Sequence, residues 1–194
     1  VTGVQTCALP IYKMDKVCMP SLISILVQDS LRTNFLIETI RNVMNDTSKS
    51  ILILSDRRSH CSDIHERLLE KNVPPTEIGV MLGGMKSQCI EECIKTKRIL
   101  ISTYQFSKEG LDVPSLNVVV FATPKSDVVQ ASGRILRSKG EKIIVDIVDY
   151  TGVFIAQYNK RKQFYKNSGF QITNVTEKTE KTEKTKETRN CLIF

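Results

Sequence analysis

The chain has 194 residues, with 28 Lys and Arg against 21 Asp and Glu, so its formal net charge is +7. Apolar residues make up 41%, Trp is absent, and there are only 9 Gly and 6 Pro. This composition excludes collagen-like, wholly disordered and disulfide-scaffold proteins, and the length fits one globular domain with a tail. The excess positive charge weakly favours a polyanionic partner such as nucleic acid.

Neither a membrane span nor a disulfide framework is expected. The apolar runs 22–27 and 118–122 are far shorter than the roughly 20 residues that a membrane helix needs. Six cysteines are scattered without a repeating spacing, which favours reduced thiols in a reducing, cytoplasmic compartment.

The two ends of the chain look unlike a folded domain. Residues 1–11 (VTGVQTCALPI) lack the features of a signal peptide. Back-translated, they resemble a sequencing adapter, so we expect an artefact there, with a genuine flexible terminus as the alternative. Residues 12–29 are then interpreted as the remnant of a linker in a truncated protein.

Residues 173–194 are predicted to be a low-complexity tail. Within them, residues 176–189 contain three Glu-Lys-Thr repeats and nothing apolar to bury, which is typical of disorder. The final residues, from Cys191 to Phe194, match a C-a-a-X prenylation pattern, but four residues are a weak match and one lipid needs a second signal. Whether Cys191 is prenylated stays open.

Between the ends, strand and helix patterns alternate. Helical spacing from Leu31 to Met44, with Asp29 or Ser30 as N-cap, precedes the apolar run 51–54 and a helix that stops before Pro74. The pattern repeats: a strand at 78–82 and a helix through 90 and 94, a strand at 99–101 and a loop, a strand at 118–121 and a helix from 126, and a strand at 143–145 and a helix over 154–165.

Strands that are apolar throughout indicate a sheet covered on both faces. We therefore predict an α/β domain over residues 30–172 with a doubly wound parallel sheet. Ligands of such sheets bind at the carboxyl ends of the strands.

Two segments after strands carry phosphate-binding chemistry. Thr103 ends the strand 99–101, and Gly110 and Asp112 follow. Hydroxyls, amides and a glycine suit phosphate contact. In the second segment, Gln130, Arg134 and Arg137 stand at i, i+4 and i+7 around Gly133, so a helix would present an amide and two guanidiniums on one face. The alternative for the arginines is a solvated basic helix end, and for Asp112 a turn cap.

These segments resemble known motifs. Residues 99–117 (ILISTYQFSKEGLDVPSLN) look like helicase motif V, residues 130–137 (QASGRILR) like motif VI, and residues 51–57 like motif IV. Together they resemble the second, RecA-like domain of superfamily 2 helicases. The segment 161–172 resembles the end of DNA helicases from phages and large, poxvirus-like DNA viruses, which favours DNA over RNA and adds a viral factory or virion as a location.

The resemblance implies roles for individual residues. It makes Arg137 the arginine finger and brings Arg134 to the γ-phosphate, while Gly110, Asp112, Gln130 and Gly133 border the nucleotide. It also implies contacts with the nucleic-acid backbone by Thr103 and Lys86. The loop after residue 54 would contribute two more contacts, through Ser55 and Arg57.

Other family features are missing from the sequence. Superfamily 2 helicases bind ATP and Mg²⁺ mainly through a P-loop and an Asp-Glu box in a first RecA-like domain. Here Met85 interrupts the Gly83-Gly84 to Lys86 spacing, and Asp146 is followed by Ile147 rather than Glu. The sequence therefore predicts half of an ATP-dependent helicase, inactive by itself, whose partners are nucleic acid and the missing domain. The rival interpretation is a non-catalytic binding module.

Several remaining residues have plainer interpretations. Cys61 with His65, and Cys89 with Cys93, stand at i, i+4, but they lack a zinc-knuckle spacing, so no metal site is predicted. His60 and His65 are expected on a helix surface. The basic stretch 160–162, among aromatic residues, either binds nucleic acid or forms the wet face of a helix.

Overall fold

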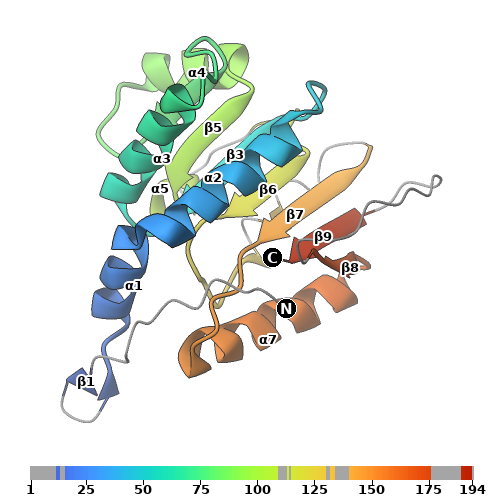
Figure 1. Ribbon diagram of the computed structural model, residues 1–194. Helices are drawn as coiled ribbons and strands as arrows, with labels where there is room; N and C mark the ends of the chain where they lie inside the picture. The colour runs from blue at the N-terminus through green and yellow to red at the C-terminus, as the bar shows by residue number, and fades with distance from the viewer. Residues whose placement is uncertain are drawn as a thin grey trace.

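The computed structural model describes residues 12–13, 16–108, 113, 115–129, 132–133, 140–175 and 189–193. Its centre is a seven-stranded sheet of order β4-β5-β3-β6-β7-β9-β8, in which every neighbouring pair is parallel (Figure 1). The strands are β3 (Ile51–Ser55), β4 (Ile78–Met81), β5 (Ile99–Thr103), β6 (Val118–Phe121), β7 (Lys142–Asp146), β8 (Gln171–Asn174) and β9 (Arg189–Ile193). The predicted RecA-like, doubly wound parallel sheet is confirmed.

Two layers of helices bury the two faces of this sheet. Ile51 and Ile53 of β3 point to the face covered by α2 (Ser30–Met44) and α3 (Arg58–Glu70). Leu52 and Leu54 point to the opposite face, covered by α4 (Ser87–Thr96), α5 (Tyr104–Lys108) and α7 (Gly152–Asn167). Each buried aliphatic side chain of this kind contributes about 1.5 to 3 kcal/mol relative to exposure, so the unbroken apolar strands stabilise both layers.

The segment before the sheet is more ordered than the linker interpretation implied. β1 (Tyr12–Lys13) pairs antiparallel with β2 (Lys16–Val17), and α1 (Met19–Gln28) follows. Leu22, Ile23 and Leu26 of α1 are buried against Phe154 of α7, because their spacing gives this helix an apolar stripe. Asp29 then caps α2 by accepting a hydrogen bond from the backbone N–H of Arg32, as the sequence predicted.

The carboxyl-terminal part also differs from the prediction of a tail from residue 173. β8 continues to Asn174, and β9 inserts between β7 and β8. The repeats at 176–188 and the first 11 residues lie outside the described residues. The loop predicted after β5 is instead the short helix α5, while the helix expected from residue 126 lies mostly outside the described part.

Two buried ion pairs join the strand ends to the helices. Arg32 of α2 donates to both carboxylate oxygens of Asp149, at 2.6 and 2.9 Å, and to the carbonyl oxygen of Ala122 at 2.8 Å. Arg161 of α7 binds Asp146 in the same bidentate way, at 2.8 and 3.0 Å. Bidentate guanidinium–carboxylate geometry is directional, so both pairs fix how α2 and α7 meet the loops after β6 and β7.

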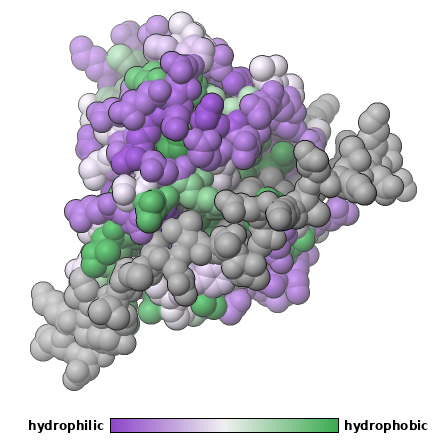
Figure 2. Space-filling model, viewed as in Figure 1, coloured by the Kyte–Doolittle hydropathy of each residue, from purple (hydrophilic) through white to green (hydrophobic). Residues whose placement is uncertain are grey.

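One face of the molecule can be seen to be mainly hydrophilic. On the face in view in Figure 2, purple side chains dominate and green ones form only small clusters. None of the helices that the structure describes is long and apolar enough to cross a membrane.

Candidate nucleic-acid interface

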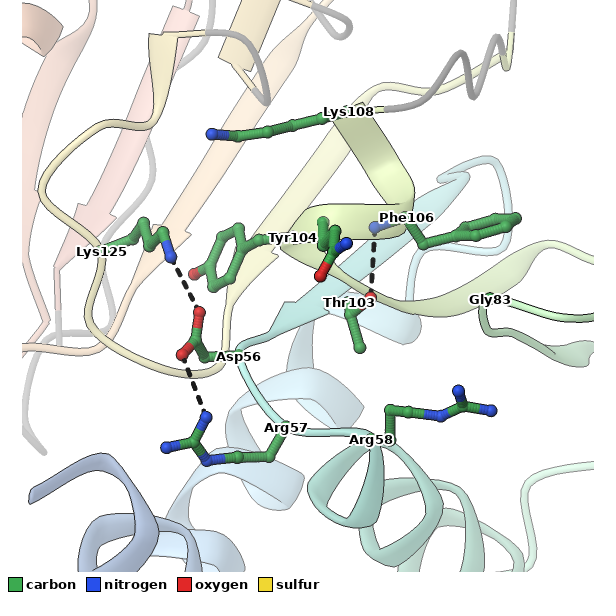
Figure 3. Close-up of a pocket in the computed structure, with 10 residues that line it drawn as sticks. Asp56, Arg57, Arg58, Gly83, Thr103, Tyr104, Phe106, Lys108 and Lys125 are labelled. Carbon is green, nitrogen blue, oxygen red and sulfur yellow. Dashed lines mark hydrogen bonds and ion pairs between the residues drawn. The ribbon is translucent and has the colours of Figure 1, made fainter. Parts of the chain in front are cut away.

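A pocket of about 480 Å³ opens at the carboxyl ends of β3 and β5 (Figure 3). We call it the strand-end pocket; it is lined by Asp56, Arg57, Arg58, Gly83, Thr103, Tyr104, Gln105, Phe106, Lys108 and Lys125. These residues come from four loops or helix starts, after β3, β4, β5 and β6. Parallel strands bring such loops to one edge of the sheet, so the topology assembles the pocket from distant parts of the chain.

The strand-end pocket is electropositive. Four cationic side chains and one carboxylate line it, which gives its wall a net charge of +3. Lys125 Nζ lies 2.8 Å from Asp56, and Arg57 lies 3.6 Å from the other oxygen of the same carboxylate. Arg58 and Lys108 have no ion-pair partner among the residues that the structure describes. Within the described part of the chain, these two cations are available to an anion from outside.

A hydrogen-bond network fixes the loops around the pocket. The Thr103 hydroxyl oxygen accepts the backbone N–H of Phe106 at 3.3 Å, at the start of α5. The Tyr104 hydroxyl donates to the carbonyl oxygen of Thr123 at 2.7 Å, and the Thr123 hydroxyl oxygen accepts the backbone N–H of Asp56 at 2.9 Å. The loops after β3, β5 and β6 are thus joined through Thr123, and burial raises the pKa of the Tyr104 phenol, which keeps it a donor.

Arg161 supports the same edge from behind. Besides Asp146, its guanidinium donates to the carbonyl oxygen of Lys125 at 2.8 Å. Asp146 also accepts the Tyr165 hydroxyl at 2.9 Å, and both members of the Arg161–Asp146 pair are about 1% exposed. The ammonium of Lys125 lies 5.4 Å from the centre of the Tyr104 ring. Both the backbone carbonyl and the ammonium of Lys125 are therefore held at the pocket.

The structure brings two of the four predicted nucleic-acid contacts into the strand-end pocket. Arg57 and Thr103 line it. Ser55 lies beside it, but its side chain is fully buried and hydrogen-bonded to His60, so its hydroxyl does not face the pocket. Lys86 is exposed at the N-cap of α4 and is not part of the lining, although Gly83 of the same loop is.

Most predicted nucleotide contacts cannot be placed. Five of them lie outside the described residues: Gly110, Asp112, Gln130, Arg134 and Arg137. Gly133 is described and half-buried, and no side chain or distant backbone of the described residues lies within 4 Å of where its Cβ would stand. The roles of all six stay predictions.

Sequence reasoning missed three of the pocket's four cationic side chains. Arg58, Lys108 and Lys125 were not singled out, although each lies within a few residues of a strand end. That position was the available signal. The prediction for His60 was wrong: it was expected on a helix surface, but it is only 1% exposed.

The described residues offer no obvious metal site. Among them, no group of three or more His, Cys, Asp or Glu side chains is arranged to hold an ion. Cys61 is on the buried side of α3, in the core, and burial raises the pKa of its thiol to about 12. Asp146, the last residue of β7, accepts hydrogen bonds from the side chains of Arg161 and Tyr165.

Comparisons with known proteins give the family. Residues 32–139 match the helicase conserved C-terminal domain. The chain is 32% identical, over 73% of its length, to protein L396 of Acanthamoeba polyphaga mimivirus, which is named as an ATP-dependent RNA helicase. It is 29% identical, over 58% of its length, to the transcript termination protein A18 of rabbit fibroma virus. It spans 28% and 25% of these two relatives, respectively.

Solved structures give the same fold. T4 UvsW superposes with a TM-score of 0.63 at 16% identity, over 91% of this chain and 37% of that one. The C-terminal domain of the DEAD-box protein Dbp5 superposes with a TM-score of 0.55 at 18% identity, over 69% of this chain and 78% of that one. The predicted preference for DNA gains no support, because the mimivirus relative is named an RNA helicase.

Proposed function

The chain belongs to the family of helicase conserved C-terminal domains, and from this premise we propose that it is the second motor domain of an ATP-dependent superfamily 2 nucleic-acid helicase. The observation that carries the proposal is the strand-end pocket, with its net charge of +3 and two cations free of ion pairs among the described residues. The proposed ligand of this pocket is the sugar-phosphate backbone of a nucleic-acid strand.

The geometry suits a backbone contact. Phosphate oxygens are bound in proteins by Arg and Lys, hydroxyls, and helix N-termini, and these contacts position a strand without reading its sequence. The pocket offers Arg58 at the first turn of the 13-residue helix α3, Lys108 at the end of α5, and the half-buried Thr103 between them. A strand lying across these three groups would bridge the loops after β3 and β5.

ATP hydrolysis is proposed for the longer protein rather than for this chain alone. The P-loop and the Asp-Glu box would come from another domain, which would hold ATP and Mg²⁺. Arg137 is proposed as the arginine finger, with Arg134 beside it at the γ-phosphate. Gly110, Asp112, Gln130 and Gly133 are proposed to border the nucleotide. A guanidinium placed there would neutralise the charge that develops during phosphoryl transfer.

The test of the pocket uses two matched double variants. In the first, Arg58→Gln and Lys108→Gln remove the two cations that have no ion-pair partner among the described residues. In the control, Lys71→Gln and Lys95→Gln remove the same charge at exposed positions away from the pocket. We expect the first to weaken binding of an oligouridine strand about tenfold or more, and to reduce the slope of log affinity against log salt by about 0.7 per lost contact. Equal losses in both variants would contradict the proposal.

The arginine finger is tested in a protein that carries the first motor domain. Arg137→Ala is expected to lower ATP turnover by about 10³ to 10⁵ while strand binding is retained. Unchanged turnover would remove Arg137 from this role.

A further inference from the structure

A second pocket, of about 300 Å³, lies between α1 and α3. We call it the helix pocket; its wall consists of Ser24, Val27, Gln28, Arg57, Ser59, His60 and Asp63. Arg57 also lines the strand-end pocket, so the two hollows share a wall. The two pockets therefore lie next to each other at this residue.

One polar group on this wall lacks a partner. His60 is 1% exposed, and its Nδ1 lies 2.9 Å from the Ser55 hydroxyl oxygen. Its Nε2 is buried and has no hydrogen-bond partner among the residues that the structure describes. Buried polar atoms are nearly always hydrogen-bonded, so this nitrogen, in a residue that lines the pocket, is a candidate donor to a ligand there.

The network around Ser55 decides which ring nitrogen carries the proton. The Ser55 hydroxyl oxygen already accepts the backbone N–H of Arg57 at 3.2 Å. Among the described residues, the acceptor available to the hydroxyl hydrogen of Ser55 is His60 Nδ1. Ser55 therefore donates to Nδ1, and Nε2 carries the hydrogen as a free donor. Burial, and then the charges of Arg32 and Arg67, lower the pKa of His60 to about 3, so this donor is neutral.

The wall of the helix pocket is suited to a neutral polar group rather than to a phosphate. Ser24, Ser59 and Gln28 are uncharged, and the Asp63 carboxylate would repel a phosphate, although Arg67 binds it at 2.9 Å. The guanidinium of Arg57 donates to the carbonyl oxygen of Pro20 at 2.8 Å, so part of its hydrogen-bonding capacity is already used. A volume of about 300 Å³ lies at the small end of ligand pockets.

We propose that the helix pocket binds the sugar or the base of one nucleotide, with His60 Nε2 donating to a neutral oxygen, in a strand whose phosphates lie in the strand-end pocket. This inference rests on the proposed function. The shared chemistry is a neutral acceptor oxygen, supplied either by a ribose hydroxyl or by a base carbonyl. Such a contact would add specificity that the phosphate contacts in the strand-end pocket do not provide.

The test fills the pocket without disturbing the core. Ser59 is exposed at the start of α3, so Ser59→Trp places a large side chain over the helix pocket, and Ser62→Trp on the same helix is the matched control outside both pockets. Affinity is measured for oligouridine, oligodeoxythymidine and an abasic deoxyribose strand. We expect Ser59→Trp to weaken oligouridine binding about three- to tenfold relative to Ser62→Trp, with an unchanged salt slope because no phosphate contact is lost.

The three strands separate the two sources of the oxygen. A loss confined to oligouridine identifies the ribose hydroxyl, and a loss shared with oligodeoxythymidine but not with the abasic strand identifies the base. His60→Phe, which removes the donor, should reproduce the loss if the variant folds. Equal affinity of Ser59→Trp and Ser62→Trp for all strands would overturn the inference. The proposed function is tested separately: it fails if the unaltered chain shows no salt-dependent strand binding, or if the two double variants described above lose equal affinity.

Discussion

Two pairs of arginines serve opposite purposes in this molecule. Arg32 and Arg161 are at most 1% exposed, and each is held by an aspartate and a backbone carbonyl. Arg57 and Arg58 stand at the start of α3 and line the strand-end pocket. The same side chain thus joins layers of the fold in one place and lines an open pocket in the other.

The difference shows that partners, rather than residue type, decide what an arginine does. A guanidinium has five N–H donors. Arg32 and Arg161 each donate three hydrogen bonds to acceptors inside the protein. Arg58 has no ion-pair partner among the described residues. The buried arginines should therefore control stability, and the pocket arginines should control binding.

The largest expected effect is the loss of a buried pair. Arg161→Met leaves the Asp146 carboxylate buried without its cation, which typically costs about 3 to 5 kcal/mol. Urea unfolding of the variant and of the unaltered chain measures this difference. A loss below about 1 kcal/mol would break the distinction between the two pairs of arginines.

A smaller effect on the free energy of unfolding concerns His60, which lies between the buried end of β3 and the helix pocket. Its pKa is about 3 in the folded chain against 6.5 when exposed, so protonation favours the unfolded state. Its contribution to stability is complete above pH 6.5 and is lost as the pH falls toward 3. Between pH 7 and pH 5, the unaltered chain should lose about 2 kcal/mol more than His60→Gln.

The control for this pH effect is His65→Gln on the same helix, where the side chain is half-buried. Free energies of unfolding at pH 7, 6 and 5 supply the comparison. If His60→Gln and His65→Gln followed the same pH profile, His60 would not be the titrating group.

The smallest effect on stability should come from the pocket. Arg58→Gln removes an exposed side chain without an ion-pair partner in the described part of the chain, so the free energy of unfolding should change by less than about 0.5 kcal/mol. The affinity for oligouridine should nevertheless fall several-fold. A variant that unfolded more easily while binding normally would reverse the roles assigned to the two regions.

Most strands and helices between residues 30 and 172 were predictable because their signals are local. Unbroken apolar runs such as Ile51–Leu54 fit strands buried on both faces, and Asp29 stands where an N-cap is needed. The strand β9 was not predictable, because residues 189–193 pair with β7 and β8 after a polar segment. Pairing at that distance leaves no local pattern.

The site was predictable only in part, for the same reason. Thr103 and Arg57 follow strands directly, and strand ends locate ligand sites in parallel sheets. The basic stretch 160–162 was ambiguous, and the structure divides it: Arg161 is buried on Asp146, while Lys160 is exposed. Fifteen residues separate Arg161 from its partner, so sequence spacing could not assign the ion pair.

The central claim is that a nucleic-acid strand lies in the strand-end pocket. The most direct measurement is cross-linking of a photoreactive oligouridine to the 194-residue chain, followed by identification of the modified peptides. The account predicts cross-links within residues 56–58 and 103–108, reduced in the Arg58→Gln, Lys108→Gln variant but not in the Lys71→Gln, Lys95→Gln control. Cross-links spread evenly over the surface lysines, or absent from both segments, would contradict it.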